Sequence, residues 1–86
     1  KAPQSFLAEV VETKTITVTV SSEDIIYVGG KVLTSGELEK YLKKLRLKSI
    51  FIKADKDSSL GAVIDIWDIC KRIGIEKVGI ATISRD

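Results

Sequence analysis

The sequence predicts a small α+β domain in which two helices pack on one face of a mixed β-sheet of about five strands. Short β-branched runs alternate apolar with polar residues, which indicates strands with one buried face. Two longer segments repeat apolar residues at helical spacing, and glycines separate the elements. The predicted order is ββ(β)αβαβ, and 86 residues with 44% hydrophobic and 30% charged side chains are enough for one such domain.

The first predicted strand spans residues 15–20, where threonine alternates with isoleucine or valine. If this strand lies at a sheet edge, its free backbone groups are able to accept a strand from another chain. The alternative is an inert edge that is shielded by residues 1–14, which we interpret as a tether ahead of a domain at residues 15–86. The period of two places three threonines on the polar face of the strand, namely Thr15, Thr17 and Thr19.

A hairpin and the first helix follow this strand. Residues 25–28 and 31–33 are predicted strands on either side of Gly29-Gly30, since a type I′ turn needs positive φ at both central positions. A capping box then predicts a helix start, with side chains of Thr34 and Glu37 that accept each other's backbone N–H groups. The helix repeats apolar residues along one stripe, at Leu38, Tyr41, Leu42 and Leu45.

The last third of the chain is predicted to form a strand, a helix and a strand. The first of these strands spans residues 49–54, and Asp57 or Ser58 is predicted to cap a helix that ends near Ile73. The last strand spans residues 78–83. Because a strand, helix and strand in succession most often form a right-handed parallel crossover, we expect the two strands to be parallel and close neighbours.

The second predicted helix is apolar on more of its circumference than a sheet can cover. A broad stripe that includes Ile66, Ile69 and Cys70 is expected to pack on the sheet, which favours a buried over a reactive cysteine. The remaining apolar flank either packs against the first helix or contacts a partner protein. Besides the three threonines, the candidate partner or dimer contacts come from this flank and the last strand: Leu60, Ile64, Trp67, Lys71, Val78, Ile80 and Thr82.

One loop carries a cluster suited to catalysis or cation binding. The sequence has no histidine, which excludes imidazole metal sites and histidine-activated nucleophiles. Asp55 and Asp57 follow a strand where α/β folds often place ligands, and they are suited to hold a divalent cation or to act as acid and base. The alternative is a structural loop with a helix cap. We expect no cofactor and no metal. We also expect no nucleic acid, because a net charge of +2 is too weak to indicate binding to nucleic acid or to an anionic membrane, and the lysines of the first helix fit a solvated face.

The order and spacing of several short motifs resemble the periplasmic domain of the ExbD/TolR family. In the first half these are the strand rich in threonine and valine, a Gly-Gly-Lys-Val hairpin and a Thr-x-x-Glu-Leu helix start. In the second half they are Ala-Asp-Lys-Asp at 54–57, the helix with residues 63–68, Gly74 at its end, and Lys-Val-Gly-Ile-Ala-Thr at 77–82. Leu60 departs from the pattern, because many members have a tyrosine early in this helix.

The resemblance implies a single-pass, non-enzymatic subunit of the cell inner membrane, with this domain in the periplasm. Such subunits form homodimers, work with ExbB- or TolQ-like channel proteins and pass proton-motive-force energy to TonB- or TolA-like transducers; some contact peptidoglycan. The family's proton-responsive aspartate lies in a membrane helix, which we expect to precede residue 1. The absence of methionine at position 1 agrees with this, and no apolar run of the chain approaches the ~20 residues of a spanning helix.

Two hypotheses for the function follow. The first is a dimerising interaction domain of an energy-transducing membrane complex, which uses exposed strand edges and the flank around Trp67. The second is a small-molecule or cation-binding regulatory α/β module that uses Asp55 and Asp57.

Overall fold

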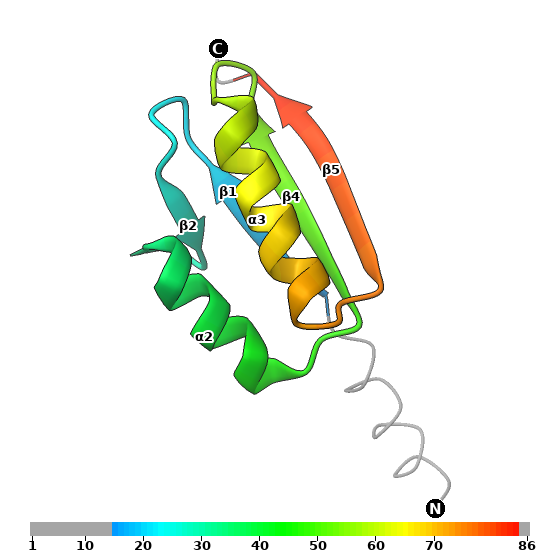
Figure 1. Ribbon diagram of the computed structural model, residues 1–86. Coiled ribbons are helices and arrows are strands. Elements are labelled where there is room, and N and C mark those ends of the chain that lie inside the picture. Colours follow the sequence, from blue (N-terminus) through cyan, green and yellow to red (C-terminus); the bar gives the residue numbers. More distant parts are fainter. Residues whose placement is uncertain (1–14, 85–86) are drawn as a thin grey trace, which may run out of the picture.

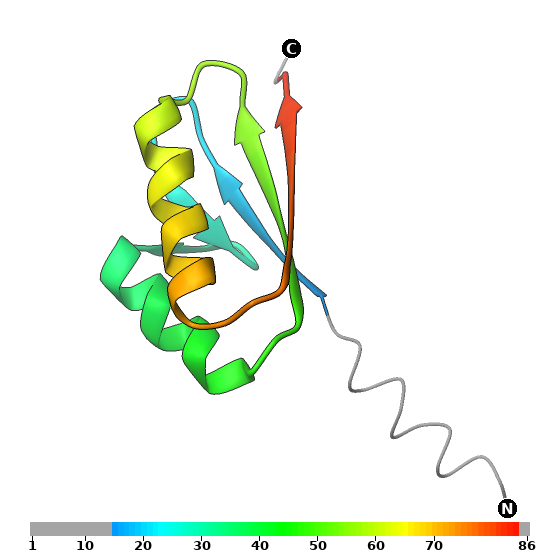
Figure 2. The ribbon, with the colours of Figure 1, turned by 45° about the vertical axis from the view of Figure 1, so that its right-hand side comes forward.

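A mixed five-stranded sheet forms one layer of the protein, and two helices form the other (Figure 1). The structure is a computed structural model, and it describes residues 15–84. Figure 2 shows both helices on the same face of the sheet, so the predicted α+β class and element order are confirmed. The predicted tether at residues 1–14 lies outside the described residues. The strands are β1 (Thr15–Val20), β2 (Ile26–Val28), β3 (Lys31–Leu33), β4 (Ser49–Asp55) and β5 (Lys77–Ile83), and the helices are α2 (Ser35–Leu45) and α3 (Leu60–Arg72).

The first strand lies at the centre of the sheet, which corrects the prediction of an edge strand. The strand order is β3-β2-β1-β4-β5, so β1 pairs antiparallel with β2 and parallel with β4. Its threonines, Thr15, Thr17 and Thr19, alternate with the residues that face the core and therefore lie on the other face of the sheet, and they do not border a free edge. The alternation of threonine with apolar residues does not distinguish a central strand from an edge strand, because a central strand with one solvent-exposed face has the same period of two. The edges of the described sheet are β3 and β5.

The hydrophobic core lies between the helices and the parallel pair of β1 and β4. Val18 stands opposite Ile52 in the register of this pair, and both side chains are fully buried. β5 continues parallel to β4, with Ile80 opposite Ile52, which confirms the predicted parallel crossover around α3. The helices cover the sheet with side chains that are also buried, namely Leu38 and Leu42 of α2 and Ile66, Ile69 and Cys70 of α3.

Two local sequence signals act as predicted. Gly29 and Gly30 have φ of 58° and 84°, so the hairpin between β2 and β3 turns where both residues need positive φ. At the start of α2, Thr34 Oγ1 accepts from the Glu37 N–H at 3.1 Å, and Glu37 Oε1 accepts from the Thr34 N–H at 2.8 Å. This capping box satisfies two backbone donors at the start of the helix.

α3 begins later than the predicted caps. Ser59 is the N-cap, and its Oγ accepts from the Ala62 N–H at 3.1 Å. Asp57 and Ser58 instead belong to a turn after β4, in which the Asp57 N–H donates to Asp55 Oδ1 at 2.9 Å. The Ser58 N–H donates to the Asp55 carbonyl, also at 2.9 Å. Because this turn occupies both residues, the helix starts only after it.

Each helix is followed by a residue with positive φ, but only one of these is glycine. Gly74 follows α3 with a φ of 91°, at the predicted helix stop. At the end of α2 the C-cap is Arg46, with φ of 52° and ψ of 49°. A residue with a Cβ pays roughly 1–2 kcal/mol in this left-handed region, and glycine does not. Arg46 therefore occupies a position where glycine would be less strained.

We expect Arg46→Gly to raise the free energy of unfolding by about 0.5 kcal/mol, because relief of the left-handed strain exceeds the added entropy of glycine in the unfolded chain. Arg46→Ala is the control, since alanine keeps the Cβ and therefore the strain. Urea denaturation followed by Trp67 fluorescence measures both variants. A glycine variant less stable than the alanine variant would contradict the role given to φ at this position.

Candidate functional site

A strip of large apolar side chains is exposed along α3. Leu60 is 74% exposed, and Ile64 and Trp67 are each 42% exposed. These residues recur at about one helical turn, so they share one flank of the helix. The stripe that packs on the sheet is a different one, which includes Ile66 and Cys70. The apolar flank predicted from the sequence is therefore outside the core.

The exposed strip faces β5 and not α2. On the other flank of α3, Arg72 Nη2 donates to Glu39 Oε1 of α2 at 2.9 Å, and Arg72 Nε donates to Glu39 Oε2 at 3.4 Å. Trp67 lies roughly 140° around the helix from Arg72. Figure 1 shows α3 between α2 and β5, with β5 beside the helix and not beneath it. The strip and the helix-facing side of β5 are therefore neighbours, and packing against the first helix does not cover this flank.

The helix-facing side of β5 is also incompletely covered. Ile80 lies on the same face as its register partner Ile52, yet Ile80 is 51% exposed whereas Ile52 is fully buried. On the same face of β5, Val78 is half-buried and Thr82 is exposed. The difference arises because the helices lie over the centre of the sheet and leave its last strand at the side (Figure 2). We call the combined apolar area the α3–β5 surface, formed by Leu60, Ile64, Trp67 and Ile80.

β5 is an edge strand that is held at both ends. It pairs with β4, and the described chain has no strand on its other side. The Lys77 N–H donates to the Lys48 carbonyl at 3.1 Å, and the Lys56 N–H donates to the Ile83 carbonyl at 2.8 Å. A fixed edge with free backbone groups beside apolar side chains is suited to pair with a strand of another chain.

Two further residues of α3 lie next to this surface. Lys71 Nζ is 5.9 Å from the centroid of the Trp67 ring, which is a cation–π contact that covers part of the ring. Cys70 is buried, as predicted. Burial raises the pKa of the Cys70 thiol, so the thiol stays protonated and poorly nucleophilic at neutral pH.

The loop after β4 places its two predicted carboxylates in different surroundings. Asp55 is only 4% exposed; its Oδ1 accepts from the Asp57 N–H, and its Oδ2 has no hydrogen-bond partner within residues 15–84. The Asp57 carboxylate is exposed and lies 3.3 Å from Lys56 Nζ. Among the described residues, no three Asp, Glu, Cys or His side chains form a group that could hold a metal ion. This geometry fits a turn that ends a strand better than a cation site.

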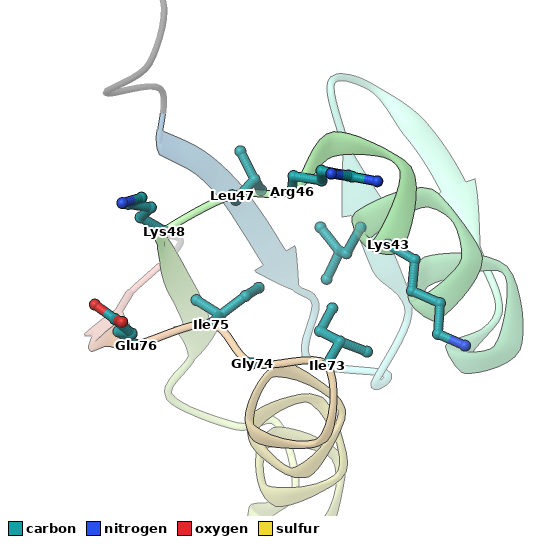
Figure 3. Close-up of a pocket in the computed structure, with 9 residues that line it drawn as sticks. Lys43, Arg46, Leu47, Lys48, Ile73, Gly74, Ile75 and Glu76 are labelled. Carbon is teal, nitrogen blue, oxygen red and sulfur yellow. The ribbon is translucent and has the colours of Figure 1, made fainter.

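A cavity at the other end of the sheet was not predicted from the sequence. It has a volume of about 300 Å³ and lies between the ends of α2 and α3 and the starts of β4 and β5. Lys43, Arg46 and Lys48 stand at its rim (Figure 3). The available signal is the density of basic residues at the end of the first helix, but a solvated helix face explains the same pattern.

Comparison with known protein families gives a match over almost the whole chain. The family described as "Biopolymer transport protein ExbD/TolR" matches residues 1–84. Comparison with curated proteins gives no match. Within residues 15–84, neither helix has the length and apolar character needed to cross a membrane. The matched range includes the α3–β5 surface, the loop after β4 with Asp55 and Asp57, and the cavity with basic residues at its rim.

We expect Asp55→Ala to lower the free energy of unfolding by about 1–2 kcal/mol, because the Asp57 N–H loses its acceptor in the turn. Asp55→Asn is the matched control, since its amide oxygen keeps that hydrogen bond and the loss should be smaller. Urea denaturation with and without Mg²⁺ or Ca²⁺ measures both variants. If either cation stabilised the unsubstituted chain but not Asp55→Asn, the result would favour a cation site over a structural turn.

Proposed function

Because this chain belongs to the ExbD/TolR family of biopolymer transport proteins, we propose that it is the periplasmic interaction and dimerisation domain of an inner-membrane subunit. Proteins of this family are transport-associated and are not enzymes, and they associate with ExbB- or TolQ-type and TonB- or TolA-type partners. On this proposal, residues 1–14 are a tether that follows a membrane helix. The domain then couples the proton motive force to a transducer that reaches the outer membrane.

The observation that carries this proposal is the α3–β5 surface beside an open strand edge. Contiguous apolar side chains on the surface of a small protein mark a site for a partner. A strand added to β5 would bond the free backbone groups of the edge and would cover Trp67 and Ile80 at the same time. The surface thus combines the two requirements of strand addition, which are backbone pairing and apolar burial.

We propose that two copies of the domain pair through this edge. A twofold axis brings the same surface of each copy together, so the two β5 strands would run antiparallel and join the two sheets. Trp67 and Ile80 of each copy would lie at the new interface, with Lys71 at its rim. A transducer segment in an extended conformation would use the same edge.

Ile80→Lys is expected to weaken self-association by at least tenfold, because the substitution removes apolar burial and places a charge on the edge strand. Sedimentation velocity over a range of protein concentrations measures this effect. Val32→Lys is the matched control, since Val32 is also an exposed apolar residue of an edge strand, at the opposite side of the sheet. A dimer that survives Ile80→Lys but is lost in Val32→Lys would place the interface on β3 instead.

Fluorescence gives an independent measurement of the same event. Trp67 is the only tryptophan of the sequence and is 42% exposed, so its emission should move to shorter wavelength when a partner strand covers it. We expect this shift at increasing protein concentration, and also when a periplasmic segment of a TonB- or TolA-type protein is added. An emission maximum that stays constant while the chain dimerises would exclude Trp67 from the interface.

A further inference from the structure

The charges of residues 15–84 are separated along the direction of the strands. At the end where β4 and β5 begin and both helices finish, residues 43–48 and 71–77 carry seven basic side chains and one acidic side chain. At the opposite end, the loop between β1 and β2, residues 55–59 and the first two turns of α3 carry five acidic side chains and one lysine. The net charge of +2 for the whole chain therefore conceals two ends of opposite sign. The acidic residues of that opposite end are Glu23, Asp24, Asp55, Asp57 and Asp65.

Five of the seven basic side chains are free to meet a ligand. Arg72 is bonded to Glu39, a contact that lowers the pKa of the Glu39 carboxyl group. Lys71 lies over the ring of Trp67. Within residues 15–84, the other five make no ion pair. They are Lys43, Lys44, Arg46, Lys48 and Lys77.

The cavity of about 300 Å³ opens among these basic side chains. Figure 3 shows Lys48 and Glu76 on one side of the cavity and Lys43 on the other, with their charged ends pointing outward, and Arg46 also at the rim. A basic rim around an apolar floor is complementary to an anionic group that carries an apolar part, which is the chemistry of a phospholipid at the headgroup level. The floor consists of aliphatic residues, namely Leu42, Leu47, Ile73 and Ile75.

Helix stability alone does not explain why basic residues surround the cavity. Lys43 and Lys44 lie in the last turn of α2, where the helix dipole favours positive charge. Arg46 and Lys48 lie beyond the helix, and Arg46 adopts a left-handed conformation that glycine would adopt with less strain. Carbonyl groups in the last turn of α3 accept from the N–H groups of residues 73–75 at 2.9–3.1 Å, so they add little negative charge to the cavity.

The chain enters the domain at this same basic end. In the register of the sheet, Thr15 stands beside Ser49 and Ser49 stands beside Lys77, so the three parallel strands begin together (Figure 2). Thr15, the first residue that the structure describes, therefore stands at the basic end. Fourteen residues span at most about 50 Å. If they lead to a membrane helix, the basic end is the part of the domain that faces the bilayer.

We propose that the basic end binds the anionic phospholipid surface of the membrane, with Lys43, Arg46 and Lys48 each reaching headgroup phosphates around the cavity and the apolar part of a lipid on the aliphatic floor. This inference rests on the proposed function for its membrane anchor, but it does not depend on dimerisation. Each basic side chain strengthens the attraction about fivefold, within a Debye length of about 8 Å. In the bound orientation the strands point away from the membrane and the edge of β5 stays open.

Co-sedimentation of the 86-residue chain with phosphatidylcholine vesicles, with or without phosphatidylglycerol, tests this proposal. We expect binding only to the vesicles that contain phosphatidylglycerol, and we expect high salt to abolish it. Lys43→Gln combined with Lys48→Gln should weaken binding by about 25-fold. Lys40→Gln combined with Lys53→Gln is the control, because it removes the same charge from positions outside the rim and should change binding much less.

Two single variants separate lipid binding from folding and from dimerisation. Arg46→Gly should be at least as stable as the unsubstituted chain, yet bind the vesicles about fivefold more weakly. Ile80→Lys should bind them at least as tightly, so a failure of the dimer and a failure of lipid binding give different results. Equal binding to both kinds of vesicle, or an equal loss in the control pair, would overturn the proposal. Binding to polyglutamate but not to phosphatidylglycerol vesicles would also overturn it, in favour of an acidic protein partner.

Discussion

The two helices lie over the centre of the sheet and leave its last strand at the side, and this placement decides which surfaces the protein exposes (Figure 2). Here the helices cover the centre, where Val18 and Ile52 are fully buried. The uncovered part falls on the edge, and Ile80 stays half exposed although it continues the row of Ile52. The flank of α3 around Trp67 is open for the same reason, because the described chain has no third helix to cover it.

The direction of the helices explains why the charges separate. Both helices run antiparallel to β4, so their carboxyl ends lie together at one end of the sheet (Figure 1). Basic residues are favoured near helix carboxyl ends and acidic residues near amino ends. When two helices point the same way, these local preferences add up across the whole domain. Arg46 and Lys48 extend the basic end beyond the helices, and this extension is the part that suits a ligand and not only a helix dipole.

The features that could be predicted from the sequence are those that a few neighbouring residues decide. The Gly29-Gly30 turn and the capping box at Thr34 depend on local hydrogen bonds and φ angles, and motif order was sufficient to indicate the family. The failures depend on distant contacts. A strand with one solvent-exposed face has the same sequence pattern at the centre and at the edge of a sheet, so the predicted edge position of β1 was wrong. Ile80 and Ile52 occupy equivalent apolar positions, and only the placement of the helices distinguishes them.

The open edge of β5 can serve one partner at a time, and this restriction gives the proposed function a physical basis. When two copies pair through β5, their backbone groups are bonded to each other, and a transducer strand must displace that pairing to use the same edge. Self-pairing and transducer binding are then two states of one surface, and their relative free energies set the balance without a change of fold. Lipid contact at the basic end would hold both copies at the same height above the membrane and raise their effective concentration. A membrane motor that alters this contact through the tether would therefore shift the balance between the two partners of β5.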